Sequence, residues 1–263
     1  TTNGYIRFWN GLTINTNGGN ITMGGGDLNG SGYATSSTTD CCDGLRADIS
    51  LSLNSANGNI VLRGKSPAVT VGSGTGAAGI LFYNMASAAT INSGSGTVEL
   101  NGYSQSSGSQ YSSGLVFHAS LVVTSSNNTA NAIKLIGKAT GTSGWAWGLE
   151  AKSDLSVIAT GGGGITISTS QLNTASNYEI VLRGTTNILA NSGAINLLGG
   201  QSSGQLNGLF YNYGNYYLGS KAGTAVTSST SNILFQYDKY ELYAARYVAT
   251  SGTFRWQPIG ASF

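Results

Sequence analysis

Short runs of alternating apolar and polar residues return at nearly regular intervals along this chain of 263 residues. One family of runs has an apolar residue, any residue, a second apolar residue and then usually Gly, as in NIVLRG, TVELNG and AINLLG. A second family begins with Gly-Leu or Gly-Ile, as in GLRADI, GILFYN and GLVFHA. Alternation with a period of two is typical of β-strands, and helical periodicity is nearly absent. The chain is therefore predicted to be all-β.

The spacing of these runs indicates how the strands are arranged. Successive runs are roughly 14–20 residues apart. Up to Leu149 the two families alternate, so that runs of the same family recur every roughly 34–35 residues. Such repeats point to a β-solenoid, in which parallel strands stack about 4.8 Å apart and the stack itself creates the core. A propeller or an antiparallel sandwich explains the recurring residue types less well. We predict a single-stranded parallel β-helix with coils of roughly 14–20 residues. One interior ladder is expected to contain Ile60, Val98, Ile133, Ile165 and Ile195.

The two ends of the chain depart from the repeat. Residues 1–17 are predicted to be an N-terminal flank or cap, 18–230 the repeat shaft, and 231–263 a C-terminal flank that caps the shaft or contacts another subunit. Glycine at the end of the first family of runs is expected to supply the positive φ of a tight corner.

One stretch of five residues, Ile-Val-Leu-Arg-Gly, occurs twice, beginning at Ile60 and at Ile180. The two copies are seven steps apart in the series of runs. Because seven is odd, the second copy occupies a position where the alternation predicts a Gly-Leu run. Arg63 and Arg183 are therefore not expected to share a partner.

The composition excludes several function classes. Charged residues make up 8% of the chain, against about 25% in a typical soluble domain. The net charge of +2 comes from scattered residues, so binding of nucleic acid is not expected. No apolar stretch approaches the roughly 18 residues of a membrane-spanning helix, so membrane insertion is not expected. The uncharged polar surface indicates an extracellular or cell-surface protein, and the start without Met suggests processing from a longer precursor.

The sequence contains few candidates for catalytic residues. Polysaccharide-cleaving enzymes of this shape need carboxyl groups within roughly 5–10 Å of each other in a cleft. Acidic residues are concentrated in one place, at Asp40, Asp43 and Asp48, and these are predicted to form a turn rather than a catalytic or metal site. His118 is the single histidine and is predicted to face solvent. We expect no enzymatic activity and no cofactor.

Cys41 and Cys42 are adjacent and are the two cysteines of the chain. Neighbouring Cα atoms lie about 3.8 Å apart, whereas disulfides usually join Cα atoms about 4.4–6.8 Å apart. Three interpretations stay open: two free thiols in a turn, a strained vicinal disulfide, and a bond to another chain. A metal site fits less well, because there is no second cysteine pair.

Aromatic residues are the strongest candidates for an interaction surface. They occur in GWAWG, in LFYNYGNYYLG and in the C-terminal flank. Two interpretations compete: rings packed inside wide corners of the coil, and an exposed surface for carbohydrate or a subunit. The residues are Trp145, Trp147, Tyr211, Tyr213, Tyr216, Tyr217, Tyr240, Tyr243 and Trp256.

The repeat text resembles that of a known family. GLTINTNGGNITMGGGDLNGSGYA, SANGNIVLRGKS, NSGSGTVELNGYSQSSG and VATSGTFRWQPIGASF are similar to the repeats of large bacterial exoproteins, the filamentous-haemagglutinin-like adhesins of the two-partner and autotransporter routes. The resemblance covers most of the chain and implies a right-handed parallel β-helix, export across the outer membrane and a role in adhesion, matrix or fibre building. The family's amino-terminal secretion domain is not recognisable here.

These observations together predict an extracellular structural and adhesive shaft segment, with self-assembly into fibres as one use. Its expected partners are copies of itself, end to end or side by side, and host or matrix glycans. The alternative is a β-helix that binds or cleaves carbohydrate.

Overall fold

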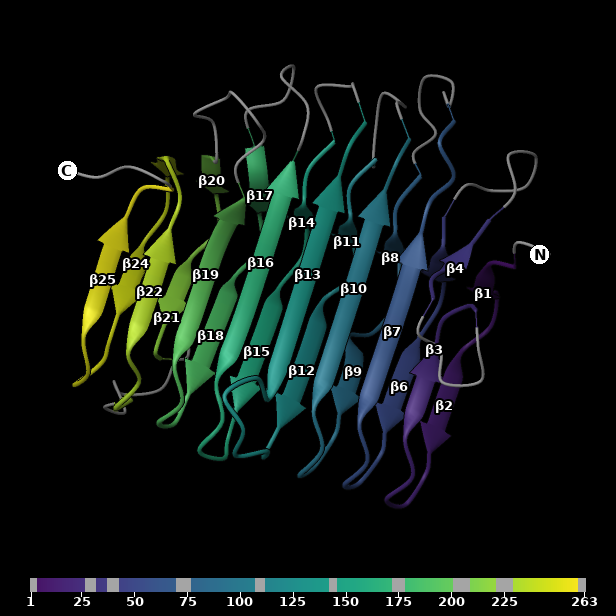
Figure 1. The fold of residues 1–263 in the computed structure, drawn as a ribbon, viewed down its shortest axis with the longest axis horizontal. Helices are drawn as coiled ribbons and strands as arrows, with labels where there is room; N and C mark the ends of the chain where they lie inside the picture. Colours follow the sequence, from purple (N-terminus) through teal and green to yellow (C-terminus); the bar gives the residue numbers. More distant parts are fainter. Residues whose placement is uncertain are drawn as a thin grey trace.

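The computed structural model describes residues 4–26, 32–36, 43–69, 77–106, 112–141, 146–171, 178–200, 209–220 and 229–259. Within these ranges there is no helix. The strands form three parallel sheets, and within each sheet the strands are stacked along the same axis (Figure 1). The predicted all-β parallel solenoid is confirmed.

Each sheet is named here by its strands. Sheet A contains β1 (Ile6–Phe8), β5 (Leu45–Ala47), β8 (Ile80–Phe82), β11 (Leu115–Phe117), β14 (Leu149–Ala151), β17 (Tyr178–Leu182), β20 (Leu209–Asn212) and β23 (Lys239–Leu242). Sheet B contains β2 (Leu12–Asn15), β6 (Leu51–Asn54), β9 (Ala89–Asn92), β12 (Leu121–Ser125), β15 (Leu155–Ala159), β18 (Thr186–Ala190), β21 (Tyr216–Leu218) and β24 (Arg246–Val248). Sheet C contains β3 (Ile21–Met23), β7 (Ile60–Lys65), β10 (Val98–Ser104), β13 (Ile133–Ala139), β16 (Ile165–Gln171), β19 (Ile195–Gly200), β22 (Ile233–Gln236) and β25 (Phe254–Gln257), and β4 (Ala34–Thr35) pairs with β7.

One turn of the solenoid passes through sheets A, B and C in that order. Its length follows from hydrogen bonds between equivalent positions of neighbouring turns. Asn59 N donates to Asn20 Oδ1 across 39 residues, and Thr185 N donates to Asp154 Oδ1 across 31 residues. The expected coil of roughly 14–20 residues is therefore wrong, because successive runs of the sequence lie alternately in sheets C and A of the same turn. The strands of sheet B, such as LSLN and ATIN, lie between these runs, so each turn contains a third strand that belongs to neither family of runs. The spacing of 34 or 35 residues, at which runs of one family recur, is the length of one turn in the middle of the chain.

The interior ladder predicted in sheet C is confirmed. Ile60 pairs with Val98, Val98 with Ile133, and the series continues through Ile165 and Ile195. In β10, β13 and β16 burial alternates strictly along seven residues, so one face lies in the core and the other faces outward. Burying apolar area, at roughly 25 cal/mol per Å², is what makes each turn depend on its neighbours.

Glycines form a seam where sheets C and A approach each other. A Cβ added at Gly102 of β10 would overlap the carbonyl oxygen of Gly114, which precedes β11. The same clash repeats one turn before and one turn after. Positive φ among the described glycines is limited to Gly18, Gly26, Gly94 and Gly219, so the expected corner role is wrong for this seam, and close backbone approach is the reason for glycine. The glycine seam consists of Gly64, Gly102 and Gly137 on sheet C and Gly44, Gly79, Gly114 and Gly148 beside sheet A.

The repeated Ile-Val-Leu-Arg-Gly stretch occupies two different sheets, and its second copy lies among the strands of the Gly-Leu runs, where the alternation predicts such a run. Ile60 begins β7 of sheet C, whereas Ile180 lies in β17 of sheet A. Arg63 forms an ion pair with Glu99, with 2.9 Å between Nε and Oε1. Arg183 lies beside Glu150. The two arginines thus have different partners.

Both predicted flanks contribute strands to the sheets. β1 and β2 lie within residues 1–17 and pair with β5 and β6. β23, β24 and β25 lie within residues 231–263 and pair with β20, β21 and β22. The repeat geometry therefore extends through the described parts of both flanks.

Candidate functional site

A row of side chains directly follows the strands of sheet A, one residue after each strand ends. From Asp48 onward the backbone N–H of the row residue donates to a carbonyl of the preceding turn, as Lys152 N does to Phe117 O at 2.8 Å and Arg183 N to Ala151 O at 2.8 Å. The row therefore runs along the solenoid axis with one side chain per layer. We call it the sheet A row; its members are Trp9, Asp48, Tyr83, His118, Lys152, Arg183, Tyr213 and Tyr243.

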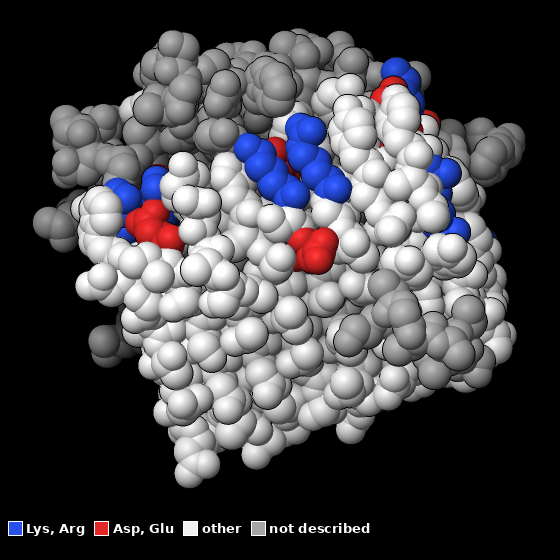
Figure 2. All heavy atoms as spheres, turned by 180° about the vertical axis from the view of Figure 1, so that it is seen from behind, with Lys and Arg blue, Asp and Glu red and all other residues white. Residues whose placement is uncertain are grey.

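Most of the row is accessible to solvent. Trp9 is 62% exposed, Tyr83 37%, Tyr213 46% and Tyr243 64%. On the face opposite sheet C, charged side chains form a few separate groups, with uncharged surface between and below them (Figure 2). The sheet A row brings aromatic and charged residues into one line on an otherwise sparsely charged protein.

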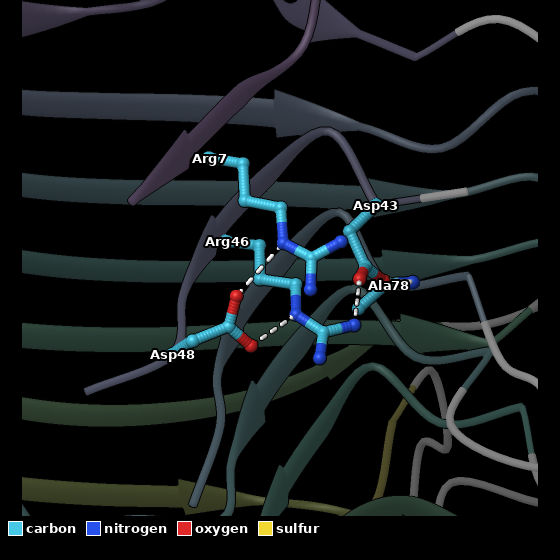
Figure 3. A network of polar contacts seen from close by, with 5 residues as sticks. All are labelled: Arg7, Asp43, Arg46, Asp48 and Ala78. Atoms are coloured by element: carbon cyan, nitrogen blue, oxygen red, sulfur yellow. Dashed lines mark hydrogen bonds and ion pairs between the residues drawn. The ribbon is translucent and has the colours of Figure 1, made fainter. Parts of the chain in front are cut away.

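The N-terminal part of the row is fixed by an ion network (Figure 3). Asp48 accepts from Arg7 Nε at 2.8 Å and from Arg46 Nε at 2.7 Å. Arg46 Nη1 also lies 3.2 Å from Asp43 Oδ2, and Ala78 N donates to Asp43 Oδ1 at 2.8 Å. These groups come from three successive turns. The described aspartates therefore connect neighbouring layers of the solenoid. The sequence predicted only that they form a local chain reversal.

Burial raises the pKa of Asp43, although the bond from Ala78 N and the charge of Arg46 act in the opposite direction. Among the residues that the structure describes, no three His, Cys, Asp or Glu side chains are grouped as metal ligands. Asp40, Cys41 and Cys42 lie outside the described residues, so the three interpretations of the cysteine pair stay as they were.

The centre of the row holds two cations above a buried carboxylate. Glu150 is 1% exposed, and its Oε1 lies 3.9 Å from Lys152 Nζ and 3.7 Å from Arg183 Nε. Glu150 Oε2 is buried, and no hydrogen bond to it is found within the described ranges. Burial raises the pKa of Glu150 to about 7, against the lowering effect of Lys152 and Arg183. This carboxyl group is thus only partly ionised near neutral pH.

His118 lies next to this centre and is half-buried, so the prediction that it faces solvent is only partly right. Its ring packs against Tyr83, with 5.5 Å between centroids. Burial, and then the charges of Lys152 and Arg46, lower the pKa of His118 to about 4. The imidazole is therefore neutral near neutral pH.

Aromatic rings and cationic side chains contact one another along the row. Arg46 lies 4.7 Å from the centroid of Tyr83, and Arg183 lies 5.5 Å from that of Tyr213. Tyr213 and Tyr243 stack, with centroids 5.4 Å apart and an interplanar angle of 18°. Such contacts hold exposed rings in one orientation.

Three of the predicted surface aromatics are buried, which corrects their assignment to an interaction surface. Trp147 is 4% exposed, Tyr211 7% and Tyr216 3%. Trp147 and Tyr211 pack with Val181 on the outer side of sheet A. Side chains of the row lie over them, Arg183 over Trp147 and Tyr213 against Tyr211. Tyr216 points into the core against Phe210, with 5.5 Å between centroids. These rings stabilise packing.

The other predicted aromatics within the described residues lie in three places. Tyr213 and Tyr243 belong to the sheet A row. Tyr217 of β21 is half-buried and stacks on Tyr247, with centroids 4.9 Å apart, while Tyr240 packs on Trp256 at 4.2 Å. Trp145 lies outside the described residues.

Sequence reasoning missed most of the row: Trp9, Tyr83 and Lys152 were not proposed as site residues, and Arg183 was noted only for its repeat. In four of the runs that begin with Gly-Leu or Gly-Ile, the row residue is the fifth, which is Asp48, Tyr83, His118 and Lys152 in turn. These residues differ in type from turn to turn, so they form no ladder of like residues in the sequence.

The C-terminal end of the solenoid has an open pocket of about 170 Å³. Its wall is formed by inward-facing residues of the last turns. Val248 pairs with the buried Leu218, and Trp256 pairs with the buried Phe235, yet each is 48% exposed. The lining residues are Tyr216, Leu218, Phe235, Leu242, Arg246, Val248, Phe254 and Trp256.

A buried polar cluster lies where the glycine seam ends. Thr169 of β16 occupies the position that Gly137 holds in β13. Its hydroxyl lies 3.0 Å from Tyr237 Oη, and Glu179 Oε2 accepts from Gly200 N at 2.9 Å. Burial, opposed by that bond, raises the pKa of Glu179 to about 8. Thr169 thus replaces glycine on sheet C, and Glu179, which precedes Ile180 as Gly148 precedes Leu149, replaces it beside sheet A.

Comparisons with protein-family models, curated proteins and solved structures give no significant match. No helix within the described ranges is long and apolar enough to cross a membrane.

Proposed function

We propose that the chain is a structural and adhesive shaft segment of a large secreted exoprotein of the filamentous-haemagglutinin type, outside the cell or on its surface. It has no enzymatic role in this proposal. Its first partner is a further solenoid turn, either from the same polypeptide or from a second copy stacked end to end, and host or matrix glycans are its second class of partner.

The observation that carries this proposal is the continuity of the three sheets. Two of them contain eight strands each and the third nine, counted over the described residues, and each turn presents the same three strands to the next. A repeat array of this kind grows by adding turns. Exposed Val248 and Trp256, each 48% accessible, mark positions that a further turn would cover. Unpaired strand edges at the same end favour pairing.

The cellular part is tested by labelling intact cells of the source organism with antibodies against this chain. We expect labelling of unbroken cells or of material shed from them. Labelling that requires lysis would contradict an extracellular shaft.

The stacking part is tested by sedimentation of the purified chain over a range of concentrations. We expect larger species at high concentration, and their loss in a Val248→Lys, Trp256→Lys variant. Ile49→Lys is the matched control, because Ile49 is 45% exposed but follows β5 on the side of the solenoid. A wild-type chain that stays monomeric at every concentration would remove self-assembly from the proposal.

A further inference from the structure

We propose that the sheet A row binds a linear polysaccharide that carries carboxylate groups, laid along the solenoid axis with Lys152 and Arg183 at its centre. This inference deepens the adhesive part of the proposed function and rests on it. The experiment below separates the two, because a shaft can stand on the cell surface without this site.

The geometry of the row fits a long polymer. Parallel strands place successive row residues about 4.8 Å apart, which is close to the length of one sugar unit in an extended chain. The row follows all eight strands of sheet A, from Trp9 to Tyr243. A small ligand would use a single pocket, whereas this line offers one contact in each layer.

The exposed rings provide flat surfaces for the apolar faces of sugars. Tyr83 lies on one side of the central cations, and Tyr213 and Tyr243 lie on the other. Each ring is already held by a neighbour: Tyr83 by Arg46 at 4.7 Å, and Tyr213 by Tyr243 at 5.4 Å. Because their conformations are fixed before binding, little side-chain entropy is lost when a ligand covers them.

The charge at the centre favours a carboxylated polymer over a neutral one. The side chains of Lys152 and Arg183 are 30% and 35% exposed, while that of Glu150 beneath them is 2% exposed. Both cations form ion pairs with Glu150, at 3.9 and 3.7 Å, and about a third of each cationic side chain faces solvent. The ligand would therefore meet two cations, and guanidinium is well shaped to bind carboxylate.

Acidic groups near the centre are few. Between Tyr83 and Tyr243 the row contains no Asp or Glu. Asp154 lies two residues after Lys152. Its Oδ1 accepts a hydrogen bond at 2.8 Å from the backbone N–H of Thr185, which directly precedes β18. An anionic chain along the row thus meets positive charge at its middle and aromatic rings on both sides.

The test measures binding of the purified chain to oligogalacturonate by calorimetry, with a neutral β-glucan oligomer of equal length alongside. We expect the wild-type protein to bind the acidic oligomer, and the Lys152→Gln, Arg183→Gln variant to bind it at least tenfold more weakly. Tyr213→Ala should also weaken binding several-fold. Thermal unfolding of each variant shows whether the fold is retained.

A matched control removes the same charge from another face. Lys65 and Lys138 of sheet C flank Tyr103, with Nζ 5.2 and 4.8 Å from the ring centroid. The Lys65→Gln, Lys138→Gln variant should bind within twofold of wild type. The proposal is overturned by no wild-type binding, by equal loss in the two double variants, or by equal binding of the neutral oligomer. The surface labelling of cells tests the proposed function separately, and its outcome does not depend on whether this site binds a polysaccharide.

Discussion

Gly102→Ala is the change that best tests how the solenoid closes. Gly102 lies in β10 of sheet C, where the backbone of sheet A comes closest. A Cβ at this position would overlap Gly114 O, and it would lie 2.7 Å from Gly114 C and 2.7 Å from Leu115 Cδ2. Non-bonded carbon atoms prefer about 3.5–4.0 Å, so the two sheets would have to separate by about 1 Å.

The expected loss of stability follows from three contributions. Overpacking of this kind costs about 1–3 kcal/mol. Gly114 O accepts from Ile80 N at 3.0 Å, and weakening that bond costs about 0.5–1.5 kcal/mol. Alanine also restricts the unfolded chain, which offsets about 0.4–1 kcal/mol. The net loss should be about 0.5–4 kcal/mol.

Urea unfolding followed by far-ultraviolet circular dichroism measures this loss. Gly4→Ala is the control, because an added Cβ there meets nothing within 4 Å, and it should change the free energy of unfolding by less than about 0.5 kcal/mol. If Gly102→Ala is as stable as Gly4→Ala, close backbone approach is not what requires glycine along the seam.

Three further predictions concern the core, a buried acid and the ion network. Leu135→Ala removes a fully buried side chain and should cost about 2–5 kcal/mol in the same assay, whereas the half-buried Ile136→Ala should cost under about 1 kcal/mol. Burial raises the pKa of Glu179 from 4.5 to about 8, so the folded state keeps a proton that the unfolded state loses. Stability should therefore fall as pH rises from 4.5 to about 8, and Glu179→Gln should remove up to about 1.4 kcal/mol per pH unit of that slope. An unchanged slope would contradict the assignment. Asp48→Asn weakens two ion pairs, one to Arg7 of the preceding turn and one to Arg46 of its own turn. It should speed amide hydrogen exchange in β1, by about 1–3 kcal/mol of protection, while β10 is unchanged. Equal protection in both proteins would show that the network does not hold β1.

The ladder of sheet C could be predicted from the sequence because its signal is local and repeated. Val98 and Ile133 pair because each begins a run with the same alternation, and the same run returns in each turn. The division of the turn into three sheets could not be predicted in this way. Strands of sheet B alternate as well, but Ala89 and Thr186 at their starts carry little apolar signal.

The candidate site was harder to find from the sequence. Tyr213 and Tyr243 were selected for their aromatic character, yet Tyr211 and Tyr216, selected on the same grounds, are buried. Composition alone does not say which side of a strand a ring occupies. Lys152 and Arg183 become neighbours only through the stacking of two turns.

The sequence by itself determined that this chain stacks parallel strands, because alternation within a run and likeness between runs are properties of the chain read in order. Only the tertiary structure decided which residues meet across turns. Gly102 faces Gly114 across the seam, and Glu150 lies beneath the cations of two layers. Such contacts depend on how turns of unequal length superimpose, and a shift of one residue in that register would bring a different set of side chains together.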